Sequence, residues 1–516
     1  MLRSHAVFAL VILMSSFFAC EKDHTTQDNN SNNTNNANNN SDGGLDGDVE
    51  DPSVYAPGDF AGAWGNGGYT LSWLDTNPSE VTYTIEKSTG DSSPFTSLTE
   101  VSGDATSFTD RDISSGDTAT TYRIRAVLGA LESEWVECET ALKAWTYVRI
   151  VGYDSLWGEE GPSMAELISG HLTYDMASLK GSDNINLVLL GDSYGDEGCI
   201  YAFIDPVQGV VIEDQPECNT GDVNTYRDFF DWVMERFSAR KYAISYWSHG
   251  GGSIPFETKK HHKSIGFDDT NGDELTADET GQVLSYLKGL TGRPIDLMFS
   301  CACLTSMVGN IYPLRDTLLY LVAGESVVGC NSDVLDVLRY VPWWSSEEIA
   351  VQNNQSQRST WAKDVVYAAT DVRSAGDLAT LLDTLVLALM DYGTPGAVQR
   401  GRLRDAAQTA QNMGYQQGPE YNDCYIDLYD YALALHELGD HAISEAANGL
   451  LDFLDSTLIV DLLIQNDDQG FYGDAHGISI YHPLDSYYSY YYFDSYDTLS
   501  FSADTSWDEY LRFLAH

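Results

Sequence analysis

Basic side chains are scarce in this chain of 516 residues. It has 27 lysines and arginines against 78 aspartates and glutamates, which gives a formal net charge of -51. A surface of that sign repels nucleic acid and the head groups of anionic lipids. We therefore expect no nucleic-acid partner, and contact with a membrane only through a covalent lipid anchor.

Cysteine and long apolar runs are also scarce. Eight cysteines are spread over the whole chain, which does not indicate a scaffold built on disulfides. Beyond the first 20 residues, no apolar run is long enough to span a membrane as a helix. Hydrophobic residues make up 43% of the chain and aromatic residues 12%, which is enough for several cores in a chain whose length predicts about three domains.

The first 20 residues have the pattern of a secretory signal peptide. Arg3 and His5 precede an apolar run over residues 6–14, and Ala19 precedes Cys20. A charged start, a short apolar segment and a small residue before the cleavage position are typical of export signals. The ending resembles the cleavage box of bacterial lipoproteins, which implies that Cys20 becomes the lipidated first residue; plain secretion is the alternative. Either way we expect export, to the bacterial cell envelope or to the extracellular space.

Residues 21–53 are predicted to be a disordered linker. Asparagine dominates residues 29–40, and such a composition buries too little apolar surface to offset the entropy cost of folding. This segment would act as a flexible tether between the N-terminus and the folded part of the chain.

Residues 54–143 are predicted to form an all-β sandwich. Apolar and polar residues alternate over residues 69–73, 81–87 and 121–127, and turn residues separate these runs. Together with Trp73, they resemble a fibronectin type III module. The resemblance implies that Tyr122 forms the tyrosine corner, and that the module is a spacer or binds glycan or protein.

From residue 144 to residue 516, predicted strands and helices alternate. Such alternation favours an α/β domain with a mostly parallel sheet covered by helices on both faces. Ligands of such sheets bind beyond the carboxyl ends of the strands. The predicted strands lie at residues 185–190, 242–247, 264–268 and 295–299, and the predicted helices at residues 222–237, 276–290 and 305–322.

Two reactive side chains follow two of these strands. His249 belongs to the segment Trp247-Ser-His-Gly-Gly-Gly, and Cys303 belongs to Phe299-Ser-Cys-Ala-Cys-Leu. A thiol and an imidazole at one edge of a sheet provide the nucleophile and the base of a cysteine hydrolase. The amides of Gly250 and Cys303 are candidate donors to an oxyanion. The alternatives are a turn histidine and a buried structural thiol.

These two motifs resemble those of the clostripain family of caspase-like cysteine peptidases. Segments at residues 219–232, 314–323, 425–430 and 477–483 extend the likeness, which covers residues 144–516. It implies a caspase-like fold and an endopeptidase that acts on peptide or protein substrates through a thioester.

Each role in the site follows from the same resemblance. His249 and Cys303 would be the catalytic dyad, with His249 lowering the pKa of the thiol, and the amides of Gly250 and Cys303 would form the oxyanion hole. The dyad requires no metal or organic cofactor. The family usually has Asp two residues before the nucleophile, where it binds a basic side chain; this chain has Cys301 there. Cys301 is therefore a substrate-pocket candidate and a rival nucleophile, and a preference for arginine or lysine is in doubt.

Other functions remain open at this point. A catalytically silent protein of the same fold could serve as a surface binding or adhesion protein. Ser193 lies in a Gly-Asp-Ser-Tyr-Gly segment typical of serine hydrolases, but a strand rather than a helix is predicted after it. His436 and His441 are five residues apart instead of the four of a zinc-binding helix. The segment at residues 269–273 begins like a calcium loop without completing it; we predict a turn there, and calcium bound elsewhere stays an option.

Overall fold

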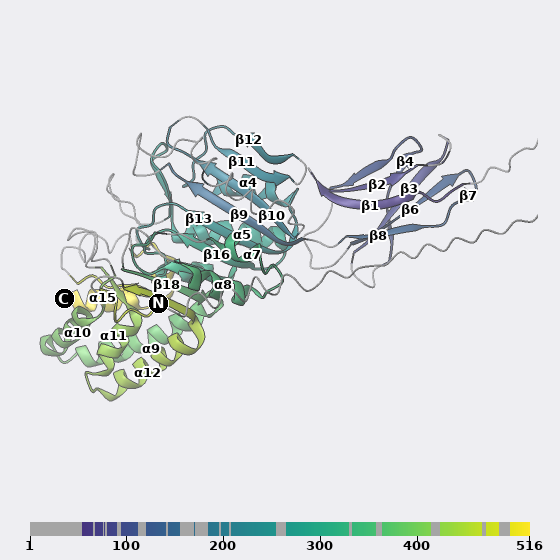
Figure 1. The fold of residues 1–516 in the computed structure, drawn as a ribbon. Coiled ribbons are helices and arrows are strands. Elements are labelled where there is room, and N and C mark those ends of the chain that lie inside the picture. The colour runs from purple at the N-terminus through teal and green to yellow at the C-terminus, as the bar shows by residue number, and fades with distance from the viewer. Residues whose placement is uncertain are drawn as a thin grey trace, which may run out of the picture. The chain divides into compact units, whose positions relative to one another are not determined.

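The computed structural model describes residues 54–515 (Figure 1), except for residues 66–67, 76, 78–79, 90–93, 112–119, 141–142, 155–169, 171–183, 196–197, 206–207, 254–264, 330–332, 358–363, 414–423, 467–470 and 485–495. The predicted export signal with Cys20 and the predicted linker of residues 21–53 lie outside the described residues. Among the helices that are described, none combines the length and the apolarity needed to cross a membrane.

The first folded part is a sandwich of two antiparallel sheets. One sheet has the order β1 (Gly58–Gly65), β2 (Gly68–Leu74), β5 (Ser107–Asp110). The other has the order β4 (Thr96–Ser102), β3 (Thr82–Thr89), β6 (Thr120–Leu128), β7 (Leu131–Glu132), and β8 (Val136–Thr140) also pairs with β6. This topology confirms the predicted fibronectin type III-like sandwich.

The sandwich core contains the predicted tyrosine. Tyr122 is fully buried, and its hydroxyl donates to the carboxylate of Asp110 over 2.7 Å. Lys87 forms an ion pair with the same carboxylate at 3.0 Å. Tyr122 therefore ties the start of β6 to the end of β5, although its partner is a side chain and not the backbone of the usual tyrosine corner.

A nine-stranded sheet forms the centre of the second part. Its central strands are parallel and are joined in the order β10, β9, β13, β16, β17, whereas β11 and β12 on one side and β18 and β20 on the other add antiparallel pairs. The α/β fold class is confirmed, with a mixed sheet that is parallel at its centre. The strands are β9 (Lys143–Gly152), β10 (Ile185–Asp192), β11 (Ile200–Asp205), β12 (Gly209–Asp214), β13 (Ala239–Trp247), β16 (Ile295–Cys301), β17 (Leu318–Gly324), β18 (Asp364–Asp371) and β20 (Ile459–Asn466).

Helices cover both faces of this sheet because side chains alternate along each strand. In β9, Val148 and Ile150 belong to the core cluster that contains α4 (Val223–Met234) and α5 (Ala277–Thr291). Trp145 and Tyr147 point to the opposite face and pack in a second cluster. The helices of that second face are α7 (Val334–Leu338) and α8 (Ser346–Ser356).

A helical region follows β18 in the chain. Its helices α9 and α12 pack against each other, as do α11 and α12 (Figure 1). Two short antiparallel pairs, β14 with β15 and β19 with β21, complete the fold. These α-helices and strands are α9 (Ala375–Gly393), α10 (Ala397–Thr409), α11 (Leu428–His436), α12 (His441–Phe453), α14 (Ser500–Asp504), α15 (Trp507–Ala515), β14 (Ile265–Asp268), β15 (Asp273–Leu275), β19 (Tyr425–Asp427) and β21 (Ser479–Tyr481). A 3-10 segment (Val372–Ser374) precedes α9, and a π-helical segment (Leu454–Leu458) follows α12.

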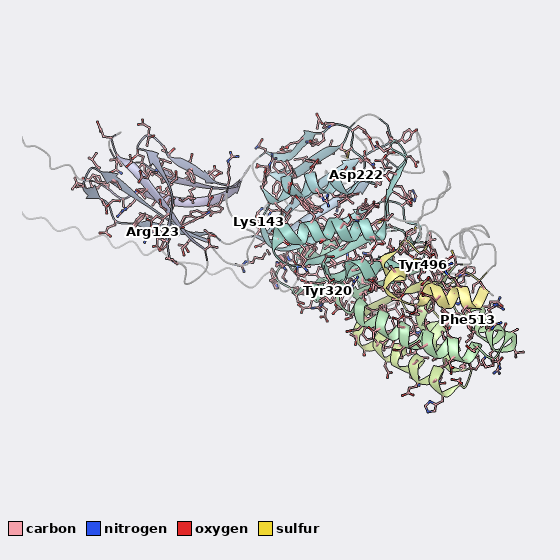
Figure 2. The ribbon with its side chains drawn as sticks, turned by 180° about the vertical axis from the view of Figure 1, so that it is seen from behind. Arg123, Lys143, Asp222, Tyr320, Tyr496 and Phe513 are labelled. Atoms are coloured by element: carbon pink, nitrogen blue, oxygen red, sulfur yellow. A yellow bond between two sulfur atoms is a disulfide. The ribbon has the colours of Figure 1, made fainter. Side chains whose placement is uncertain are left out.

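Two predicted helix starts are confirmed and one predicted helix is wrong. Asp222, labelled in Figure 2, caps α4. Its side chain accepts from the amide of Asn224, and Thr276 opens α5 with a capping box. Residues 305–322 do not form one helix. They contain short turns, α6 (Val308–Ile311) and a 3-10 segment (Tyr312–Leu314), followed by β17. The apolar run of β17 is buried on both faces, so it lacks the alternation that marks a half-exposed strand.

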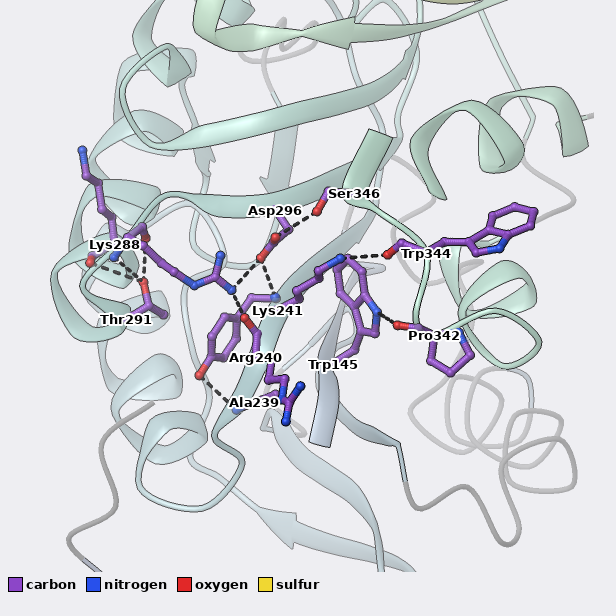
Figure 3. A network of polar contacts seen from close by, with 12 residues as sticks. Trp145, Ala239, Arg240, Lys241, Lys288, Thr291, Asp296, Pro342, Trp344 and Ser346 are labelled. Atoms are coloured by element: carbon purple, nitrogen blue, oxygen red, sulfur yellow. Dashed lines mark hydrogen bonds and ion pairs between the residues drawn. The ribbon is translucent and has the colours of Figure 1, made fainter. Parts of the chain in front are cut away.

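A polar network joins the strands at their amino ends. Asp296, at the start of β16, is 3% exposed. Its carboxylate accepts from the amide of Tyr242 at 2.9 Å, the hydroxyl of Ser346 at 2.9 Å and the guanidinium of Arg293 at 2.9 Å (Figure 3). Nearby, Lys241 donates to the carbonyl of Trp344 at 2.8 Å. These bonds fix the edge of the sheet that is opposite to the predicted site.

Candidate active site

His249 and Cys303 follow neighbouring parallel strands at the same level. In the pairing of β13 with β16, Trp247 lies opposite Cys301. His249 is two residues beyond Trp247, and Cys303 is two residues beyond Cys301. Because parallel strands end at the same edge of a sheet, both residues lie just beyond its carboxyl edge, as the strand-end positions predicted.

Gly250 makes the contact between the two motifs. A β-carbon on Gly250 would lie 2.9 Å from the amide nitrogen of Cys303 and 2.9 Å from the β-carbon of Ala302, and closer still to the carbonyl oxygen of Cys303. Only glycine allows this approach of two backbones. Gly250 therefore brings the histidine loop into direct contact with the turn that carries Cys303.

The turn that carries Cys303 is held by the loop after β17. The amide of Leu304 donates to the carbonyl of Ser326 at 3.1 Å, and Leu304 has a φ of 55°, a left-handed conformation uncommon for leucine. The amide of Val328 lies 3.4 Å from the sulfur of Cys303. The thiol therefore has a backbone donor that the sequence did not reveal, because Val328 belongs to no recognisable motif.

Burial governs the protonation of both candidate groups. It raises the pKa of Cys303, while the amides of Val328 and of Cys303 itself act in the opposite direction. It lowers the pKa of His249, and the nearby carboxylate of Asp269 partly opposes that effect. The resemblance implied a lowered thiol pKa, whereas here the pKa is raised. Both shifts favour the uncharged form, a neutral thiol on Cys303 and a neutral imidazole on His249, in the free protein.

Cys301 differs chemically from Cys303. Cys301 is disulfide-bonded, whereas Cys303 is a free cysteine. A disulfide sulfur has no proton to lose and is not the thiolate that attacks a carbonyl. Cys303 is therefore the only thiol in the Cys-Ala-Cys segment. A second disulfide joins Cys199 and Cys218. The wide spacing of the cysteines along the chain had given no indication of either bridge.

A buried carboxyl pair lies behind the cysteine turn. Glu325 and Asp427 are both fully buried, and the carboxyl of Asp427 lies near enough to raise the pKa of Glu325. Glu325 accepts from the amide of Gly477 at 2.8 Å, and Asp427 accepts from the amide of His476 at 2.6 Å. Burial, followed by the charge of Asp427, raises the pKa of Glu325 well above its usual range. Sequence reasoning missed this pair because its two members are far apart in the chain.

The other predicted sites have different surroundings. Ser193 follows β10, is 1% exposed, and is succeeded by β11 instead of a helix, so the serine-hydrolase geometry is not formed. His436 ends α11 and His441 begins α12, so they are not on one zinc-binding helix. Residues 269–272 form the predicted turn, between β14 and β15.

The family model of the clostripain family matches residues 168–513, about two thirds of the sequence. The chain belongs to the clostripain family. This is a family of cysteine peptidases, whose substrates are peptides or proteins. No curated protein matches the sequence.

Several solved structures resemble this clostripain-family protein, among them three C11 proteases. A secreted C11 cysteine protease from Bacteroides thetaiotaomicron, named iotapain, shares 13% identity, with 71% of this chain and 100% of that chain covered and a TM-score of 0.50. An inactive zymogen of a C11 protease from Parabacteroides distasonis shares 16%, with 71% and 99% covered and a TM-score of 0.49. A secreted C11 cysteine protease from Bacteroides thetaiotaomicron with an irreversible peptide inhibitor shares 15%, with 72% and 99% covered and a TM-score of 0.47. At 13% identity the likeness to iotapain concerns the fold alone.

Proposed function

We propose that this protein is an exported cysteine endopeptidase that uses His249 and Cys303 as its catalytic dyad. The observation that carries the proposal is the register of β13 and β16, which supports a position of both side chains at one sheet edge. Family membership and the free thiol of Cys303 agree with it.

The proposed reaction begins with a neutral pair. As Cys303 attacks the carbonyl carbon of the scissile bond, its proton passes to His249. The negative charge on the carbonyl oxygen is stabilised by the amides of Gly250 and Cys303; the close approach of these two residues supports this pairing. His249 then protonates the leaving amine, a thioester remains on Cys303, and water hydrolyses it. These steps call for no metal or organic cofactor.

Export and lipid attachment belong to the same proposal. The sequence over residues 1–20 supports export, and the disulfide between Cys199 and Cys218 is typical of proteins in oxidising compartments. Two of the neighbouring structures are described as secreted. Anchoring through Cys20 is tested by growing cells with a labelled fatty acid: the protein incorporates the label, and Cys20→Ser does not.

A peptide-based electrophile that alkylates thiols separates the enzyme from a silent binding protein. We expect covalent labelling of the purified parent, with complete loss in Cys303→Ala and a loss of at least about 100-fold in rate in His249→Ala. Labelling that survives in Cys303→Ala would refute the dyad. No labelling of the parent across a library of peptide sequences would favour the binding protein.

Cleavage preference follows from the position two residues before the nucleophile. Cys301 offers no carboxylate to pair with arginine or lysine in a substrate. We therefore expect the dyad to cleave a peptide library without a strong requirement for a basic residue. Cys301 stays our candidate for the wall of the substrate pocket.

A further inference from the structure

A surface pocket lies where the sheet meets the helical region. Its volume is about 170 Å³, and its walls come from α11, from the π-helical segment Leu454–Leu458, from β20 and from the segment before β21. Neither His249 nor Cys303 lines it. Pockets that bury a whole small molecule begin at about 300 Å³. This pocket therefore has the size to hold one long side chain.

Two stacked rings contribute to the wall of the pocket. Tyr429 and His476 lie face to face, with ring centroids 3.9 Å apart and planes inclined by 20°. Nδ1 of His476 lies 2.9 Å from the carbonyl oxygen of Asp474. A carbonyl only accepts, so the ring proton is on Nδ1, and Nε2 of the neutral ring is an acceptor. The wall therefore combines aromatic surface, which attracts cations, with a hydrogen-bond acceptor.

The charges around the pocket are negative. Asp455 lines the pocket and is exposed, and one of its oxygens accepts from the hydroxyl of Tyr429 at 3.1 Å. Burial raises the pKa of Tyr429, and the hydrogen bond and the charge of Asp455 raise it further. The charges of Asp452 and Asp427 act in the same direction. Since a carboxylate has several acceptor sites, Asp455 can bind a second donor, and the pocket attracts cations and repels anions.

Apolar side chains supply most of the remaining lining. Leu454 and Ile478 are each 1% exposed, whereas Leu462 is 36% exposed at the rim. Lysine and arginine side chains have the matching division, an apolar stem that ends in a charged head. A bare metal ion has no stem and needs several oxygen ligands around one point. The lining therefore fits an aliphatic cation.

We propose that this pocket binds the side chain of one lysine or arginine residue of a polypeptide. The stem would lie against Leu454 and Leu462, and the charged head would bind Asp455 beside the rings of Tyr429 and His476. Among the strands that the structure describes, β20 is the last one on its side of the sheet. An extended segment can add to the outer edge of such a strand, which favours a polypeptide over a free amine.

One short segment connects the pocket to the turn after Cys303. The carbonyl of Gly477, which follows His476, accepts from the hydroxyl of Ser306 at 2.6 Å. The amide of Ser479 donates to the carbonyl of Ser306 at 3.1 Å. A polypeptide held in the pocket would therefore contact the segment that supports the cysteine turn. Use of the pocket to hold a substrate rests on the proposed peptidase function, whereas the binding itself does not.

Peptide binding to the full chain with Cys303→Ala tests the pocket without cleavage. Three blocked pentapeptides carry lysine, norleucine or glutamate between pairs of glycines, and saturation-transfer NMR measures each Kd at physiological ionic strength. Norleucine has the stem of lysine without the charge. We expect the lysine peptide to bind at least about 10-fold more tightly than the norleucine peptide. Equal affinity of these two peptides, or tighter binding of the glutamate peptide, would overturn the assignment to a cation.

Substitutions locate the bound lysine. Asp455→Asn removes the charge of the pocket, Tyr429→Leu removes one ring, and Asp405→Asn on the exposed face of α10 is the matched control. We expect the affinity for the lysine peptide to fall by at least about 5-fold in Asp455→Asn. It should fall by about 2–5-fold in Tyr429→Leu and stay unchanged in the control.

Two further results would overturn the proposal. Unchanged affinity in both pocket variants would place the lysine elsewhere on the acidic surface. Binding of butylamine as tight as that of the lysine peptide would assign the pocket to free amines. If Tyr429→Leu fails to fold, Asp455→Asn decides alone, because Asp455 is exposed. A failure of the proposed peptidase reaction would leave these affinities as they are, since all of them are measured without the thiol of Cys303.

Discussion

Gly250 lies against the backbone of Cys303 with no space for a side chain between them. The contact joins the two loops that carry the proposed dyad, at the two residues whose amides are proposed as the oxyanion hole. An added methyl group must therefore push the loops apart. Displacements of about 1 Å at a reacting centre reduce rates by roughly 100-fold.

Gly250→Ala tests this contact. We expect kcat/KM for a peptide substrate to fall by at least about 100-fold, with a smaller loss of stability. Gly401→Ala is the control, because a β-carbon on Gly401 meets no atom within 4 Å and this glycine lies in the helix α10. It should leave the rate unchanged and stabilise the fold by about 0.5–1 kcal/mol. Full activity in Gly250→Ala would show that the two loops tolerate separation.

The positions of the two candidate residues at strand ends could be predicted from the sequence. His249 and Cys303 each follow a short apolar run with a turn after it, so their place at the carboxyl edge of a parallel sheet could be predicted. The same reasoning failed for residues 305–322, because a strand buried on both faces has no alternation. The run of β17 was therefore assigned to a helix.

Contacts between residues far apart in the chain could not be predicted from the sequence. Glu325 and Asp427, and the set formed by Asp154, Asp192 and Glu217, come together only when the sheet is assembled. Nothing in the spacing of these residues distinguishes them from the many acidic residues of the surface. The disulfide bonding of Cys301 could not be predicted either, because cysteine spacing alone does not determine which cysteines pair.

Cys301 and Cys303 should respond differently to an alkylating reagent. Without reductant, iodoacetamide is expected to modify Cys303 and not Cys301, because Cys301 is disulfide-bonded. Peptide mapping by mass spectrometry measures both. Cys301→Ser should keep the peptidase reaction while losing about 2–4 kcal/mol of stability with the disulfide. Hydrolysis that persists in Cys303→Ala and disappears in Cys301→Ser would reverse the assignment.

The Glu325–Asp427 pair predicts a loss of stability as the pH rises. Burial raises the pKa of Glu325 well above 4.5 and that of Asp427 from 3.8 to about 6. At a pH between the ordinary and the raised pKa values, the native state holds more protons than the unfolded state. The contribution of the pair to the free energy of unfolding is therefore complete below about pH 4, and it is lost as the pH rises through 6 and above. The loss per proton is up to about 1.4 kcal/mol for each pH unit.

Glu325→Gln isolates this effect. The amide oxygen can still accept from the amide of Gly477, and the amide group has no proton to lose in this pH range. His476, whose Nδ1 lies 3.8 Å from Asp427, is present in both proteins and does not enter the difference. Between pH 5 and pH 8 the Tm of the parent should fall more steeply than that of Glu325→Gln. Parallel Tm curves would show that the pair does not titrate in this range.

The amino edge of the sheet offers a test of stability apart from catalysis. Asp296→Ala removes a buried carboxylate that accepts from Tyr242, Ser346 and Arg293. It leaves the buried amide of Tyr242 without its acceptor, which should destabilise the fold by about 2–4 kcal/mol in denaturant unfolding. Because Asp296 and the proposed dyad lie at opposite ends of β13 and β16, kcat/KM of the folded fraction should stay within about 3-fold of the parent. A loss of rate comparable to that of Gly250→Ala would mean that strain passes along these strands from one edge to the other, and that the two edges do not act independently.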